Sequence, residues 1–167
     1  MEEPQVRTYD VVDANPIAIV IRCVDRRFRK AHKEFIAQEL GLQGEDFWPI
    51  KPPGGAGALA RPSQMDAEFR SINTDIEFFV QHSDIKHIIL INHQDCRRYD
   101  KLVDRTACEH PERQDLIVAH KLLLRKYPRI EISAYFARFT DETCSRIFFE
   151  AIHASSLHKA AQELQLA

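Results

Sequence analysis

The chain has 167 residues, a length that favours one domain over residues 1–167 and excludes a two-domain enzyme. Apolar residues make up 44% and charged residues 29%, which is enough to bury a core and excludes wholesale disorder. Because 23 Lys and Arg face 25 Asp and Glu, the formal charge of -2 excludes a general nucleic-acid binder.

The start of the chain, Met-Glu-Glu-Pro, lacks the basic and apolar regions of a secretory signal. The longest apolar runs, at 17–21 and 88–91, are too short to span a membrane. We therefore expect a cytoplasmic protein without a membrane partner. In that compartment, the 4 cysteines are better candidates for metal binding or thiolate chemistry than for disulfides.

The first part of the chain predicts two strands around a helix. Residues 16–24 are apolar and β-branched, which is typical of a strand buried on both faces, and Cys23 lies near its end. Helical spacing predicts a helix over 26–40, before a glycine that is a plausible C-terminal cap. A second, short strand is expected at 47–50, and the glycine-rich segment 54–57 is expected to be a flexible loop.

The most regular helical periodicity of the chain runs from 65 to 80, and Ser63 with Asp66 resembles a capping box at its start. The apolar segment 86–92 then predicts another buried strand. His93 follows this strand at once, so a second potential metal ligand lies at a strand end.

The last part of the chain continues the alternation of helices and strands. We expect a helix over 116–127, a strand over 130–139 and a short edge strand at 147–149, with Ser155 or Ser156 capping a final helix. Such alternation predicts an α/β fold with a mostly parallel central sheet of four to five strands and helices on both faces.

Three potential metal ligands follow these predicted strands. In open α/β sheets, ligands bind beyond the carboxyl ends of neighbouring strands. Cys23 lies at one such end and His93 and Cys96 at another, so the three side chains are able to converge. Two cysteines and a histidine with an open fourth position form a catalytic zinc pattern. The alternative is that both cysteines are small buried apolar residues.

The motif C-x-D-x-R at 23–27, the glycine-rich loop and the motif H-x-x-C at 93–96 occur in this order. Together they resemble the β-class carbonic anhydrase family, including its compact members, from about residue 17 to 139. The resemblance implies the fold of that family. It also implies a lyase of the carbonate dehydratase type, which hydrates carbon dioxide to bicarbonate by a zinc-bound hydroxide.

The resemblance also assigns roles to individual residues. By similarity, Cys23, His93 and Cys96 would hold zinc. Asp25 and Arg27 would form the dyad beside the fourth coordination position, and Asp25 would itself ligate the metal in a closed state. The alternative for this dyad is a solvated ion pair at the start of a helix.

By the same resemblance, Gly55, Ala56 and Gly57 would lie at the substrate pocket, near the boundary of a homodimer or larger homo-oligomer. The segment 55–60 also matches a relaxed dinucleotide-binding fingerprint, G-x-G-x-x-A. That match is weak, because the Arg-Pro pair at 61–62 would interrupt the helix that the fingerprint needs.

Arg97 departs from the family pattern, which has glycine after the ligating cysteine, and Arg98 follows it. These cations would narrow the pocket, attract bicarbonate or point to solvent. Two other functions therefore stay open: a zinc hydrolase of a carbon dioxide analogue, such as carbonyl sulfide or carbon disulfide, and a non-catalytic zinc-binding member. The remaining cysteines and histidines are interpreted as surface or packing residues, namely Cys108, Cys144, His32, His82, His87, His110, His120, His153 and His158.

Overall fold

A computed structural model describes residues 10–153 of the chain. Its sheet has five strands in the order β2-β1-β3-β4-β5. The strands are β1 (Ala18–Arg22), β2 (Phe47–Ile50), β3 (His87–His93), β4 (Glu131–Phe139) and β5 (Ile147–Ala151). β2, β1, β3 and β4 are parallel, and β5 runs antiparallel to β4. The predicted α/β fold with a mostly parallel sheet is confirmed.

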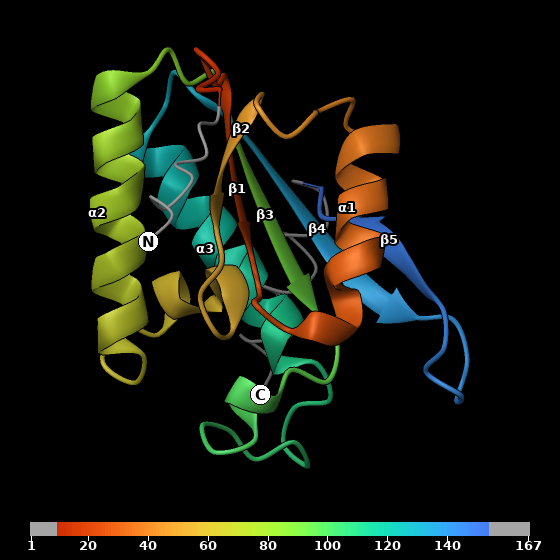
Figure 1. Ribbon diagram of the computed structural model, residues 1–167. Coiled ribbons are helices and arrows are strands. Elements are labelled where there is room, and N and C mark those ends of the chain that lie inside the picture. The colour runs from red at the N-terminus through yellow and green to blue at the C-terminus, as the bar shows by residue number, and fades with distance from the viewer. Residues whose placement is uncertain (1–9, 154–167) are drawn as a thin grey trace, which may run out of the picture.

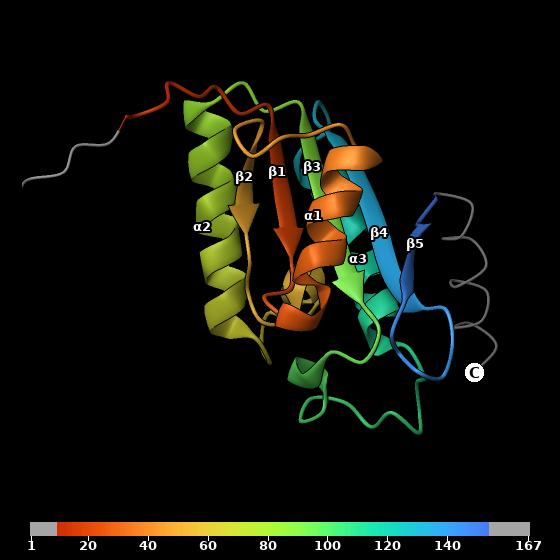
Figure 2. The ribbon, with the colours of Figure 1, turned by 45° about the vertical axis from the view of Figure 1, so that its right-hand side comes forward.

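The helices lie on both faces of this sheet (Figures 1 and 2). They are α1 (Arg29–Gln38), α2 (Asp66–His82) and α3 (Pro111–Lys126), with the short 3-10 helices η1 (Arg26–Phe28), η2 (Gly55–Ala60) and η3 (Arg97–Tyr99). α1 packs on one face of the sheet, and α2, η2 and α3 pack on the other. Among the described residues, no helix is both long and apolar enough to cross a membrane.

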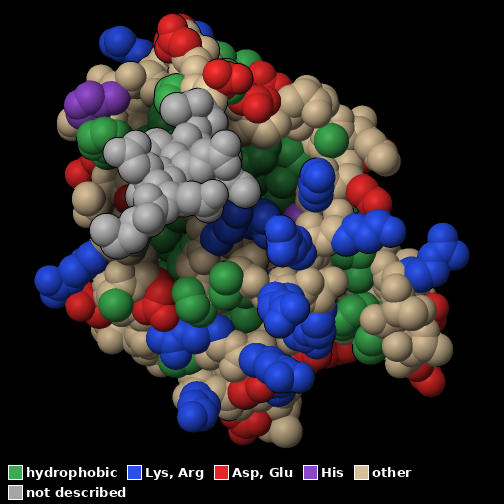
Figure 3. All heavy atoms as spheres, in the orientation of Figure 1, with side chains coloured by type: hydrophobic (Ala, Val, Ile, Leu, Met, Phe, Trp, Pro, Cys, Tyr) green, Lys and Arg blue, Asp and Glu red, His purple; other side chains and the backbone are tan. Residues whose placement is uncertain are grey.

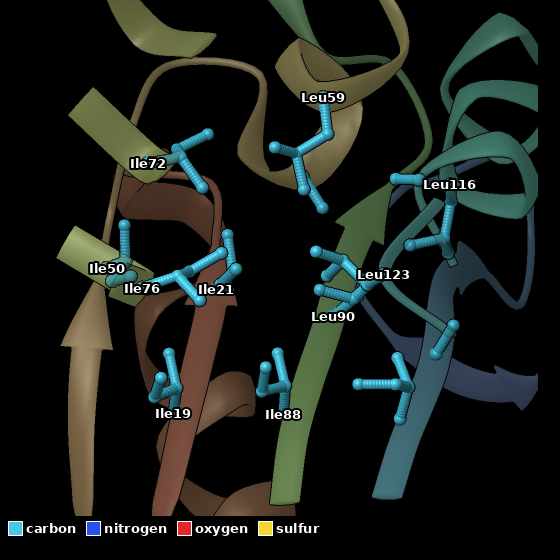
Figure 4. Close-up of a cluster of buried hydrophobic side chains, with 14 of the residues drawn as sticks. Ile19, Ile21, Ile50, Leu59, Ile72, Ile76, Ile88, Leu90, Leu116 and Leu123 are labelled. Atoms are coloured by element: carbon cyan, nitrogen blue, oxygen red, sulfur yellow. The ribbon is translucent and has the colours of Figure 1, made fainter. Parts of the chain in front are cut away.

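Each face of the sheet carries a hydrophobic cluster, and side chains of the central strands contribute alternately to the two clusters. Ile19 and Ile21 of β1 join the larger cluster, which includes residues of α2, η2 and α3, whereas Val20 faces the cluster beside α1. Figure 4 shows Ile88 and Leu90 of β3 in the same larger cluster. Burial on both faces explains why these strands are uninterrupted apolar runs in the sequence.

Three local predictions need correction. The N-cap of α2 is Met65, without a side-chain capping bond, so the predicted capping box of Ser63 and Asp66 is wrong. α3 begins at Pro111, five residues before the predicted start at 116, because proline is compatible with the first helical turn. The glycine-rich segment forms η2 instead of an open loop. The predicted final helix lies outside the described residues.

The order of the strands creates a crevice at the carboxyl ends of the parallel strands. β1 lies between β2 and β3, so the chain leaves β1 toward one side and returns on the other. The carboxyl ends of β1 and β3 are therefore neighbours whose following loops diverge. Cys23 follows the first of these ends and His93 closes the second.

Leu90→Ala tests the larger core. Leu90 is fully buried, and we expect its truncation to lower the free energy of unfolding by about 2 to 5 kcal/mol, through lost burial and a residual cavity. The matched control is Leu122→Ala on α3, because Leu122 is 42% exposed. Urea denaturation measures both variants, and equal losses would contradict the assigned core.

Candidate metal centre

Cys23, His93 and Cys96 converge beyond the ends of β1 and β3. Their candidate ligand atoms all lie within 4.8 Å of one another, and all three residues are buried. Cys23 follows β1 directly, His93 is the last residue of β3, and Cys96 is the N-cap residue of η3. Two loops 70 residues apart therefore bring two sulfurs and an imidazole to one place, as the motif spacing predicts.

The orientation of His93 leaves one ring nitrogen available for a metal. His93 Nδ1 lies 2.8 Å from the carbonyl oxygen of Gln94, which only accepts hydrogen bonds, so Nδ1 carries the hydrogen. Nε2 is buried and has no hydrogen-bond partner among the described residues. The ring also stacks on Phe28 at 4.0 Å between centroids. A lone pair on a fixed ring is what a metal ligand needs.

The separation of the two sulfurs fits zinc. Cys23 Sγ and Cys96 Sγ lie 3.8 Å apart. Two sulfurs at about 2.3 Å from a tetrahedral zinc ion would be about 3.8 Å apart. The donor set of two soft sulfurs and one imidazole is also one that zinc prefers. These residues therefore fit the metal that the motifs indicate.

The two thiols are close enough to influence each other's ionisation. Their mutual contact lowers the pKa of Cys23, although burial acts in the opposite direction. The same contact and burial raise the pKa of Cys96. Loss of one proton from the pair is thus favoured, whereas loss of the second requires a cation between the sulfurs.

Asp25 and Arg27 form a multidentate ion pair beside these ligands. Arg27 Nε donates to Asp25 Oδ1 and Oδ2 at 3.2 and 3.1 Å, and Arg27 Nη2 donates to Oδ2 at 2.8 Å. These hydrogen bonds hold the pKa of Asp25 below its usual value. Asp25 Oδ2 also lies 3.9 Å from His93 Nε2, so an ionised carboxylate borders the ligand cluster.

Arg27 also joins the two loops that carry the ligands. Its Nη1 donates to Asp95 Oδ2 at 3.0 Å, and its Nη2 donates to the Asp95 carbonyl oxygen at 2.8 Å. Asp95 has a φ of 58°, an unusual conformation for a residue other than glycine. The sequence analysis did not single out Asp95, although it lies inside the H-x-x-C motif, between two proposed ligands.

Glu112 and Arg105 hold the main chain of Cys96. Glu112 Oε1 accepts hydrogen bonds from Cys96 N at 2.9 Å and from Arg105 Nη2 at 2.8 Å. Arg105 Nη2 also donates to the Cys96 carbonyl oxygen at 3.1 Å. Both peptide groups of Cys96 are thereby fixed by one ion pair, whose carboxylate is buried and whose guanidinium is partly exposed. No sequence motif marks Glu112 or Arg105, so the sequence analysis missed them.

The glycine-rich segment packs directly beneath the crevice. Asn92 Oδ1 accepts a hydrogen bond from Ala56 N at 3.0 Å, and Asn92 Nδ2 donates to the Glu112 carbonyl oxygen at 3.0 Å. Gly55 has a φ of 58°, and a Cβ there would lie 2.7 Å from Asn92 Oδ1 and 3.0 Å from Cys23 N. Close approach to both strand ends therefore requires a residue without a side chain.

A pocket of about 540 Å³ opens over the two cysteines. Its lining includes Cys23, Val24, Asp25, Arg26, Arg27, Pro53, Gly54, Cys96, Arg97 and Arg98. The glycine-rich segment contributes Gly54 to this wall, whereas Gly55, Ala56 and Gly57 are buried behind it. Arg97 is at the pocket and exposed, and Arg98 lines it while donating to Glu68 Oε1 at 3.0 Å.

The remaining cysteines and histidines of the described part of the chain include both surface and packing residues. Cys144 is exposed and Cys108 is partly exposed, and both are free thiols. His32 and His120 are buried, and His120 Nε2 contacts the Ile132 carbonyl oxygen at 3.0 Å. His158 lies outside the described residues.

Comparison with solved structures identifies the fold. A β-carbonic anhydrase of Aspergillus fumigatus matches with a TM-score of 0.53 and 14% identity, over 88% of this chain and 81% of that one. A second β-carbonic anhydrase of that fungus gives 0.51 and 10%, over 91% and 95%. The isoform I β-carbonic anhydrase of Trichomonas vaginalis gives 0.51 and 12%, over 87% of each chain.

The chain shares the fold of these enzymes. The family resemblance is thus confirmed at the level of the fold. No protein-family model matches the chain. A protein of Rickettsia bellii (strain RML369-C) described as uncharacterized is 27% identical over 123 residues, which are 70% of this chain and 73% of that protein.

Gly57→Ala tests the close packing of the glycine-rich segment. A Cβ at position 57 would overlap the buried hydroxyl of Tyr99. We expect a loss of about 1 to 3 kcal/mol in the free energy of unfolding, because a packed core resists added volume. Gly44→Ala is the control, since a Cβ there meets nothing within 4 Å. Thermal or chemical denaturation that leaves both variants alike would contradict this packing.

Proposed function

We propose that the protein binds one zinc ion through Cys23, His93 and Cys96 and hydrates carbon dioxide to bicarbonate and a proton. The observation that carries this proposal is the convergence of the three ligand atoms within 4.8 Å, next to the ion pair of Asp25 and Arg27. The shared fold supports it, because the crevice lies where a sheet of this topology binds its ligands.

Zinc, when bound, lowers the pKa of a coordinated water to about 7 and thereby supplies a nucleophile at neutral pH. Cys23, His93 and Cys96 would supply three ligands, and the two cysteines also line the pocket. Val24 and Pro53 line this pocket and are compatible with a small apolar substrate.

Asp25 is proposed to accept a hydrogen bond from the water at the open position and so to orient it. Arg27 acts through Asp25: its hydrogen bonds keep the carboxylate ionised and fix its direction. The observed pairing of Asp25 with Arg27 supports an open state, in which Asp25 does not ligate the metal. Ligation by Asp25 in a closed state would require the carboxylate to leave this pairing.

Metal analysis tests the proposed ligands. We expect about one zinc ion per chain in the purified protein, and loss of that zinc in Cys96→Ser, because thiolates contribute heavily to zinc affinity. Cys144→Ser is the matched control, because Cys144 is exposed and outside the cluster. Full zinc content in Cys96→Ser, measured by mass spectrometry, would refute the proposed site.

Stopped-flow hydration of carbon dioxide tests the catalytic proposal. Zinc-replete protein is expected to accelerate hydration above the buffer rate, and Arg27→Gln is expected to lower kcat by about 10- to 100-fold with zinc retained. The control Arg70→Gln breaks an exposed Arg–Asp pair on α2 and should keep the wild-type rate. Zinc-replete wild-type protein without activity would refute hydration but not metal binding.

A second candidate rests on Arg97. Arg97 places a guanidinium at the pocket, and this cation motivates hydrolysis of a carbon dioxide analogue such as carbonyl sulfide or carbon disulfide. Product analysis with carbon dioxide, carbonyl sulfide and carbon disulfide separates this hydrolase from a hydratase. The homo-oligomer and the cytoplasmic location stay predictions.

A further inference from the structure

A second hollow lies between α1 and the β1–β2 edge of the sheet. It has a volume of about 390 Å³, and four cationic side chains line it: Arg22, Arg29, Lys33 and Lys51. We call this hollow the α1–β2 groove, and no aspartate or glutamate of the described residues lines it. Figure 3 shows Lys and Arg side chains gathered across the middle of this face of the molecule.

The positive charge of the α1–β2 groove is not neutralised by nearby carboxylates. Within residues 10–153, none of its four cations lies within 4.0 Å of a carboxylate oxygen. In the pocket over Cys23 and Cys96, which we call the metal-site pocket, two of the four arginines are paired: Arg27 with Asp25 and Arg98 with Glu68. Like charges gathered in one concave site repel one another, and a bound anion would relieve that repulsion.

Arg22 shows this lack of compensation most clearly. Its side chain comes from the end of β1 and is only partly exposed. The Arg22 side chain contacts His32, whose Nδ1 lies 3.4 Å from Arg22 Nη1. An imidazole carries no negative charge in either protonation state, so His32 does not balance the guanidinium. A partly buried cation without a counter-charge is costly.

The apolar part of the lining adds a second requirement for the occupant. Ile36, Leu42 and Phe47 line the same groove as the four cations. The groove volume falls in the range of about 300 to 1,000 Å³ that is typical of small-molecule sites. A concave site of this size suits a small ligand better than an extended polymer. Guanidinium and ammonium groups together recognise phosphate and carboxylate oxygens.

We propose that the α1–β2 groove binds a small, multiply charged oxyanion that carries an apolar group. Among residues 10–153, none lines both the groove and the metal-site pocket, so the two proposals can be tested separately. A failure of carbon dioxide hydration would therefore leave this proposal intact, and the reverse also holds.

Isothermal titration with phenyl phosphate and phthalate tests the groove on the full-length, zinc-replete protein. Both probes are dianions with an aromatic ring, and they distinguish a phosphate from a carboxylate preference. We expect saturable binding of at least one probe at one site per chain. The double variant Lys33→Gln/Lys51→Gln should weaken it at least about tenfold, because both lysines are exposed and their loss removes charge but not core packing.

Two control variants locate the binding. Lys30→Gln removes an exposed charge from α1 that pairs with Glu34 and does not line the groove, and it should leave the affinity unchanged. Arg26→Gln/Arg97→Gln removes two charges from the metal-site pocket and should also leave it unchanged.

Three results would overturn the proposal. The first is the absence of saturable binding by either probe. The second is binding that survives Lys33→Gln/Lys51→Gln but is lost in Arg26→Gln/Arg97→Gln, which would place the anion in the metal-site pocket. The third is binding of a short single-stranded oligonucleotide when neither small dianion binds.

Discussion

The parallel pairing of β1 with β3 is the constraint on which the candidate site depends. Its register sets Ile21 opposite Leu90 and Arg22 opposite Ile91, so the next residues of both strands emerge together. Burial on both faces fixes this register, because a shift by one residue would move every side chain to the opposite face. Cys23 and His93 are neighbours for this reason, despite their distance along the chain.

The parts of the fold that rest on apolar patterning were predictable from the sequence. Uninterrupted apolar runs marked β1 and β3, and the regular periodicity at 65–80 marked α2. Local boundaries were less predictable, because Pro111 and the polar first turn of α3 carry no apolar period. The three potential metal ligands could be named because their motifs follow strands. Glu112 could not, because its partner Cys96 is brought to it only by the fold.

Charge is distributed unevenly over this nearly neutral chain. Around the proposed metal centre, Arg27 is shared between Asp25 and Asp95, so a cation and two carboxylates fix one another in place. Around the α1–β2 groove, four cations line the walls, and no acid within residues 10–153 joins them. The first arrangement is suited to holding side chains in one geometry, whereas the second is suited to attracting a mobile counter-charge.

The close packing of η2 limits which substitutions are tolerated in the crevice beyond β1 and β3. Its floor at Gly55 and Gly57 consists of main-chain atoms, because any added carbon would collide with Asn92, Cys23 or Tyr99. A substitution at Gly55 or Gly57 therefore cannot introduce a functional group without disrupting this packing. Chemical variety is therefore confined to the rim, where Arg26 and Arg97 project from exposed positions. In this architecture, the exposed rim is therefore able to accept new side chains that the packing at Gly55 and Gly57 excludes.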